Sequence, residues 1–128
     1  LVAHGSRWLM TRVLVIDDNV DAADSLAELL ELEGYEVVVR YTGLDGLAEA
    51  RAQVPDVVVC DIGLPDLDGY AVARALRAEL PKQPLLVALS GYATPEDRQE
   101  SKAAGFDAHL AKPPRWAELI AVLGRARV

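Results

Sequence analysis

The chain has 128 residues, of which 52% are hydrophobic and 26% are charged, and its formal net charge is −7. This length suffices for one domain with a hydrophobic core, and the composition is that of a globular protein rather than a disordered one. The negative charge argues against direct nucleic-acid binding, because a phosphate backbone recruits lysine and arginine.

The single cysteine, Cys60, excludes a disulfide within the chain and fits a reducing compartment. We see no signal peptide and no apolar stretch long enough to span a bilayer, so we expect a cytoplasmic protein without membrane insertion. The first nine residues (LVAHGSRWL) do not fit the pattern that begins at Thr11, and Met10 resembles a natural start. We expect residues 1–10 to be an expression-tag remnant or a disordered N-terminus and residues 11–128 to form the domain.

Strand-like and helix-like segments alternate along the chain. Continuous apolar runs rich in β-branched residues predict strands that are covered on both faces, at residues 12–17, 36–41, 57–61, 85–90 and 108–111. Helical spacing with capping residues predicts helices between and after them, at residues 21–33, 44–52, 70–80, 95–104 and 115–125. Alternating units of this length favour right-handed crossovers. We therefore predict an α/β protein of the (βα)5 type, with a doubly wound, five-stranded parallel sheet.

The apolar side chains predict which helix faces are buried. In the first helix Leu26, Leu29 and Leu30 form one stripe, and in the second Leu47 and Ala48 should face inward. The helix at 95–104 carries few large apolar residues, so it should be the least firmly anchored.

Four of the predicted strands deliver a reactive side chain at or near their last residue. These side chains are Asp17 with Asp18, then Asp61, Ser90 and Lys112. The carboxyl ends of parallel strands lie along one edge of the sheet, where ligands bind in such folds. Three carboxylates, a hydroxyl and an ammonium should therefore converge in one crevice, and this set suits a divalent cation and a phosphoryl group.

Each acidic element has a functional and a structural interpretation. Asp17 and Asp18 repel each other unless a cation compensates, and Mg²⁺ suits them because it prefers oxygen ligands; alternatively, one of them only caps the following helix. Asp61 can be a metal ligand, a nucleophile that forms an aspartyl phosphate, or a simple turn residue. The backbone carbonyl of Gly63 could complete the metal shell.

Ser90 and Lys112 are weaker signals when each is taken alone. A hydroxyl followed by Gly91 can approach a phosphoryl oxygen closely, and a lysine can present a point charge to the same group. A serine after a strand is also a common helix cap, and a lysine is commonly solvated. Their order after the acids, across successive strand ends, is the stronger signal.

The motifs VLVIDDN, VVVCDIGLPDLDGY, ALSGYA and AGFDAHLAKPP together resemble the receiver domain of two-component response regulators and hybrid histidine kinases, over residues 12–124. The resemblance implies a flavodoxin-like sheet with strand order 2-1-3-4-5. It implies that Asp61 is the phosphoacceptor and that Ser90 and Lys112 contact the phosphoryl group. It further implies that Mg²⁺ (or Mn²⁺) is bound by Asp17, Asp18, Asp61 and the backbone of Gly63, and that the Lys112–Pro113 bond is cis.

One position departs from this family pattern. His109 stands three residues before the lysine, where the family usually has a tyrosine or phenylalanine that turns inward on phosphorylation. Imidazole can titrate and form hydrogen bonds, so His109 is either a modified switch that acts with Ser90 or a surface residue of a short edge strand. Tyr92 either gates the crevice or lies on the surface.

The resemblance implies a phosphoacceptor switch rather than an enzyme. Its partner would be a sensor histidine kinase or a histidine phosphotransfer protein, and a homodimer would form through the fourth helix, fifth strand and fifth helix. A phosphatase of the haloacid-dehalogenase type would need a second aspartate at position 63, which is glycine, and flavin binding would need a phosphate loop after the first strand in place of Asp17-Asp18-Asn19. An interaction module that works without phosphorylation remains the alternative.

Overall fold

A computed structural model describes residues 10–91 and 93–126 of the chain. The predictions for residues 1–9 and for Tyr92 lie outside this part. The strands and helices alternate as predicted: β1 (Arg12–Ile16), α2 (Val20–Leu32), β2 (Glu36–Arg40), α3 (Gly43–Ala52), β3 (Val57–Asp61), α4 (Gly69–Glu79), β4 (Leu85–Ser90), α5 (Pro95–Ala104), β5 (Ala108–Ala111) and α6 (Trp116–Leu123). No boundary differs from the predicted one by more than two residues.

The strands form one parallel sheet of order β2-β1-β3-β4-β5, which confirms the predicted topology. The register sets the carboxyl ends of the central strands level with one another. Ile16 pairs with Cys60, Asp61 with Leu89, and Ser90 with Ala111. The residues at and just beyond these ends therefore share one edge of the sheet.

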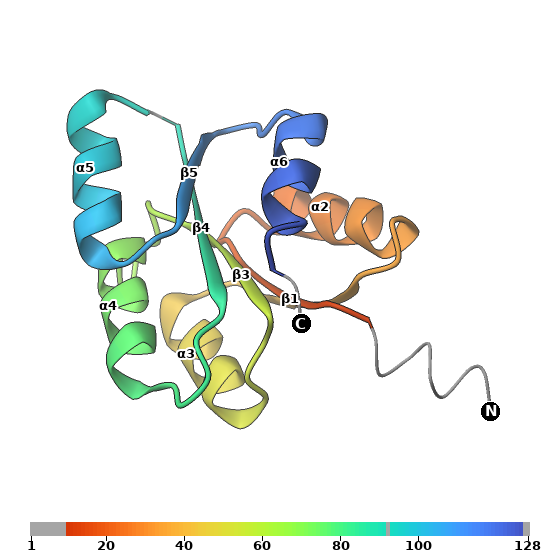
Figure 1. Cartoon of the computed structure of the whole chain (residues 1–128), viewed down its shortest axis with the longest axis horizontal. Coiled ribbons are helices and arrows are strands. Elements are labelled where there is room, and N and C mark those ends of the chain that lie inside the picture. Colours follow the sequence, from red (N-terminus) through yellow and green to blue (C-terminus); the bar gives the residue numbers. More distant parts are fainter. Residues whose placement is uncertain (1–9, 92, 127–128) are drawn as a thin grey trace.

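Helices cover both faces of the sheet (Figure 1), with α2 and α6 on one side and α3, α4 and α5 on the other. Alternate side chains of each strand enter opposite cores. On β1, Leu14 and Ile16 pack toward α3 and α4, whereas Val13 and Val15 pack toward α2 and α6. All four are almost completely buried. This double coverage explains why the central strands are continuously apolar rather than alternating.

Two details of the predicted helix faces are wrong. Leu29 is 49% exposed and Ala48 is also exposed, whereas Leu30 and Ala50 are fully buried. The inner stripe of α2 runs through Ala23, Ala27 and Leu30, and Leu29 lies one residue, or about 100° of helix rotation, away from it. Helix α5 buries only the small residues Ser101 and Ala104, in agreement with its predicted weak anchoring.

None of the helices in the described part of the chain has the length and hydropathy needed to cross a bilayer.

Candidate functional site

The predicted acids meet at the carboxyl edge of the sheet. Ligand oxygens of Asp17, Asp18 and Asp61 all lie within 4.8 Å of one another. Asp17 and Asp61 are only 4% and 8% exposed, whereas Asp18 is exposed. At this separation each pair of charges repels by about 3.5 kcal/mol at an effective dielectric constant near 20 and by about 0.9 kcal/mol in bulk water. The folded chain must therefore compensate these charges.

Lys112 supplies part of this compensation. Its Nζ lies 3.0 Å from Oδ2 of Asp17 and 3.3 Å from Oδ2 of Asp61. Burial alone would lower the pKa of Lys112, but the hydrogen bond to Asp17 and the charges of both carboxylates outweigh it and raise that pKa. The remaining oxygens of the two buried acids accept backbone hydrogen bonds, Oδ1 of Asp17 from Asn19 N–H and Oδ1 of Asp61 from Gly63 N–H, both at 3.0 Å.

This donor set fits a divalent cation. One ammonium against three carboxylates leaves two negative charges unbalanced, and carboxylate oxygens are the ligands that Mg²⁺ prefers. The alternative that Asp17 or Asp18 serves as the cap of α2 is wrong, because Asn19 Oδ1 accepts from Ala22 N–H at 3.0 Å.

The backbone at the end of β3 packs closely against the start of α4. A Cβ on Gly69 would lie 2.7 Å from Ile62 Cα and 2.8 Å from the carbonyl oxygen of Asp61. Both contacts are with backbone atoms, so the start of α4 approaches the end of β3 as closely as glycine allows. This contact holds the Asp61 backbone in place.

The loop between β3 and α4 is also tied to α3. The Asp66 carboxylate accepts the N–H groups of Gly43 (2.9 Å) and Leu44 (3.0 Å), and these two bonds lower the pKa of Asp66. Sequence reasoning missed this tie, because an aspartate in a loop gives no signal of which distant helix terminus it will cap.

Asp61 opens onto a cavity of about 320 Å³. Its lining residues are Asp61, Ile62, Gly63, Tyr70, Ser90, Gly91 and Asp97. The structure thus places three predicted site residues, Asp61, Gly63 and Ser90, on one cavity. Lys112 does not line this cavity, but its ammonium contacts the carboxylates of both Asp61 and Asp17. The sequence analysis did not identify Tyr70 and Asp97 as residues of this cavity. Both lie in the first turn of a helix that follows a strand end, and this position could have indicated that they lie near the site.

Ser90 has a close neighbour on the adjacent strand. Its Oγ lies 2.7 Å from Nε2 of His109, and His109 is only 8% exposed. The alternative that His109 is a surface residue is therefore wrong. Burial, and next the charge of Arg98, lower the pKa of His109. The backbone N–H of Lys112 donates to the Ser90 carbonyl at 2.8 Å, and the Lys112–Pro113 bond is cis, as the family resemblance implied.

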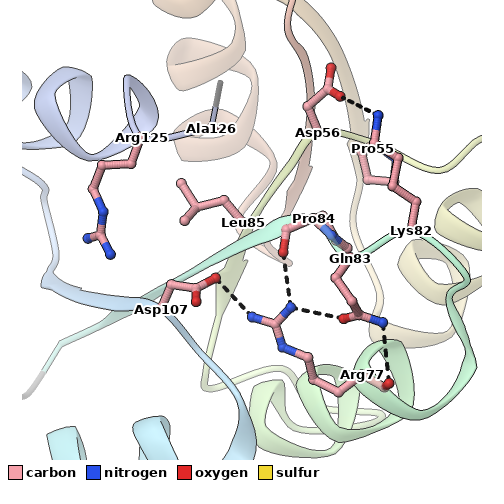
Figure 2. Close-up of a pocket in the computed structure, with 10 residues that line it drawn as sticks. All are labelled: Pro55, Asp56, Arg77, Lys82, Gln83, Pro84, Leu85, Asp107, Arg125 and Ala126. Atoms are coloured by element: carbon pink, nitrogen blue, oxygen red, sulfur yellow. Dashed lines mark hydrogen bonds and ion pairs between the residues drawn. The ribbon is translucent and has the colours of Figure 1, made fainter. Parts of the chain in front are cut away.

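A second cavity, of about 350 Å³, lies at the opposite, amino-terminal edge of the sheet (Figure 2). The guanidinium of Arg77 lines it and donates to the carbonyls of Gly105 and Pro84, to Oε1 of Gln83 and to the Asp107 carboxylate. These bonds join α4 to the segments that precede β4 and β5. Because the Arg77 charge is engaged internally, we interpret this edge as structural.

Comparisons with known proteins show the family to which this chain belongs. The family model described as the response regulator receiver domain matches residues 13–124. The chain is 43% identical over 110 residues to the transcriptional regulatory protein PrrA of Mycobacterium tuberculosis, which covers 86% of this chain and 47% of PrrA. It is 40% identical over 101 residues to the transcriptional regulatory protein CreB of Escherichia coli, covering 79% of this chain and 44% of CreB. The chain thus spans about half the length of these relatives.

A solved structure has the same fold. The chemotaxis response regulator CheY4 of Vibrio cholerae superposes with a TM-score of 0.84 at 30% identity, and the match covers 91% of this chain and 98% of that one.

Proposed function

Because the chain belongs to the response regulator receiver domain family, we propose that it accepts a phosphoryl group on Asp61 as a switch in a two-component phosphorelay. The observation that carries this proposal is the position of one buried carboxylate. Asp61 lies between a pair of acids suited to Mg²⁺, the ammonium of Lys112, and a cavity that also contains Ser90.

In the proposed reaction, a carboxylate oxygen of Asp61 attacks the phosphorus of a phosphohistidine on a sensor histidine kinase or a histidine phosphotransfer protein. The new P–O bond forms as the P–N bond breaks, and the imidazole nitrogen leaves with the electron pair. Lys112 offsets the negative charge of the transferred group, and the Ser90 hydroxyl donates to one of its oxygens. Asp17, Asp18, Asp61 and the Gly63 carbonyl would hold Mg²⁺ (or Mn²⁺), which neutralises charge on the phosphoryl oxygens when bound.

The conformational response would pass through the segment that follows β4. Movement of Ser90 toward the phosphoryl group would pull the connection to α5, and α5 buries only two small side chains. A modest free-energy difference could therefore shift this helix. We propose that α5, β5 and α6 form the surface that reports the phosphorylated state, including to a second copy of the chain in a homodimer.

This function needs no turnover chemistry. A phosphatase of the haloacid-dehalogenase type would require an aspartate two residues after Asp61, and that position is Gly63. We therefore assign a phosphoacceptor switch rather than an enzyme. We place it in the cytoplasm, because a free cysteine such as the buried Cys60 fits a reducing compartment.

The test is labelling with a small phosphodonor, such as acetyl phosphate, in the presence of Mg²⁺, followed by intact-protein mass spectrometry. We expect one phosphoryl group on the natural chain and none on Asp61→Asn, whereas Asp45→Asn, at an exposed position of α3, should label normally. Label that persists on Asp61→Asn would refute the acceptor assignment. A natural chain that never labels would favour the phosphorylation-independent interaction module.

A further inference from the structure

An acid at the start of helix α5 lines the phosphoacceptor cavity. Asp97, in the first turn of α5, shares the cavity of about 320 Å³ with Asp61 and Ser90. A cavity of this volume is only about 8 Å across, so a charge on one wall acts on a group bound at the other. The phosphoryl transfer described above gives Asp97 no role, although its charge has the same sign as the group that Asp61 would receive.

The start of α5 holds the carboxylate of Asp97 in place. Its Oδ2 accepts from the backbone N–H of Thr94 at 3.4 Å, and Oγ1 of Thr94 accepts from the N–H of Asp97 at 3.1 Å, which together form a capping box. The amino terminus of a helix favours the ionised form of such an acid. Among residues 10–91 and 93–126, no lysine or arginine forms an ion pair with Asp97. Its charge is therefore fixed in position but not balanced by a cation.

Tyr70, on the wall formed by α4, lies within reach of the same charges. Burial raises the pKa of Tyr70, and the charges of Glu100 and Asp97 raise it further. Glu100 is exposed and does not line the cavity, whereas Asp97 does. The α5 side of the cavity thus carries a negative potential, and Asp97 is the acid on α5 that lines the cavity.

Helix α5 is weakly enough anchored to respond to a repulsion at its first turn. It buries only the small side chains of Ser101 and Ala104. Near its start, Nη1 of Arg98 donates to the backbone carbonyl of His109 on β5 at 2.9 Å. A few such contacts can be exchanged for others at a modest free-energy cost, so added negative charge in the cavity can be relieved by movement of the helix start.

We propose that Asp97 opposes a phosphoryl group on Asp61 by its charge, so that phosphorylation pushes the first turn of α5 away from the site. This inference rests on the proposed function and adds a regulator to it. An aspartyl phosphate carries more negative charge than the free carboxylate, so the repulsion grows when the group is transferred. Asp97 therefore limits how much of the phosphorylated state accumulates, and the relief of this repulsion contributes to the displacement of α5.

The test measures the affinity of beryllofluoride, a phosphoryl mimic, at saturating Mg²⁺ for the natural chain, Asp97→Asn and Glu96→Gln. Asparagine keeps an oxygen acceptor for the cap and removes the charge. Two unit charges about 8 Å apart should give Asp97→Asn about 2- to 30-fold tighter binding at low ionic strength, and the gain should shrink in about 1 M salt. Glu96 is exposed in the same turn and does not line the cavity, so Glu96→Gln should have a smaller effect.

Mg²⁺ binding without the mimic separates charge from loosened structure. Removing a negative charge should weaken the binding of the cation by about 2- to 6-fold at low ionic strength while it tightens the binding of the anion. A variant whose site is only loosened should lose affinity for both ligands. Weaker binding of both by Asp97→Asn, or a gain for the mimic no larger than that of Glu96→Gln, would overturn the proposal.

The response of α5 is measured from amide chemical shifts of its residues on saturation with the mimic. We expect smaller shifts in Asp97→Asn than in the natural chain and in Glu96→Gln, and equal shifts in all three would contradict the coupling to α5. If the natural chain does not bind the mimic, or if Asp61→Asn still binds it, the proposed function fails and this inference falls with it. Equal, Asp61-dependent binding by the natural chain and Asp97→Asn refutes this inference alone.

Discussion

Replacing Asp18 with asparagine should stabilise the protein in the absence of divalent metal. Asp18 is exposed, so its repulsion from Asp17 and from Asp61 is close to the aqueous value of about 0.9 kcal/mol for each pair at 4.8 Å. Asp17 and Asp18 are chain neighbours and repel each other in the unfolded state as well, which removes part of one contribution. We therefore expect the free energy of unfolding to rise by about 1–1.5 kcal/mol, or about 3–6 °C in Tm.

The assay is thermal or urea unfolding, followed by circular dichroism, with EDTA and then with Mg²⁺. A cation held at ten times its dissociation constant stabilises the folded state by about 1.4 kcal/mol, and Asp18→Asn should lose most of this gain because one ligand is gone. Glu28→Gln on the exposed side of α2 is the matched control, since it removes the same charge away from the site. Its stability should change little in either buffer.

Two results would refute the reasoning. If Asp18→Asn is less stable than the natural chain in EDTA, the three carboxylates do not repel as their spacing requires. If the variant keeps the full Mg²⁺-induced increase in Tm, Asp18 is not a ligand.

Three further predictions concern the surroundings of the site. Gly69→Ala should lower the free energy of unfolding by about 2 kcal/mol or more, because its Cβ would lie 2.7 Å from a backbone atom. The control Gly91→Ala places its Cβ in open space and should lower the free energy of unfolding by less than about 1 kcal/mol. Equal urea midpoints for the two variants would contradict this prediction. Lys112→Met should lower the free energy of unfolding in EDTA by about 2–3 kcal/mol, because it removes the ammonium that contacts Asp17 and Asp61. Mg²⁺ should restore more stability to this variant than to the exposed control Lys102→Met. Equal recovery would show that the ammonium does not balance the acids. Cys60 is fully buried and burial raises its thiol pKa, so Ellman's reagent should react only as fast as the chain opens, and a rapid burst in native buffer would refute this.

The sequence was sufficient to predict the sheet and the convergence of the site, because both follow from patterns that repeat along the chain. Each central strand is a continuous apolar run, and Asp17, Asp61, Ser90 and Lys112 lie at or directly after strand ends that a parallel sheet must bring together. The orientation of His109 could not be predicted in this way. Its burial depends on how β5 pairs with β4 and on the cover provided by α5, and the sequence around His109 indicates neither.

The helix faces show the same limit on a smaller scale. Leu29 and Leu30 are chemically identical neighbours, and only the docking angle of α2 decides that Leu30 is buried. The tie from Asp66 to the start of α3 also joins two segments more than twenty residues apart. Such contacts are set by the assembled fold rather than by the residues around them.

The division of the interior by the sheet has a consequence for how this protein could diverge. Leu76 of α4 and Leu119 of α6 belong to separate cores, with the sheet between them. Losses of stability caused by substitutions on the two sides should therefore simply add. A lineage could remodel one helical layer by mutational drift while the other layer, and the partners that it recognises, stayed unaltered.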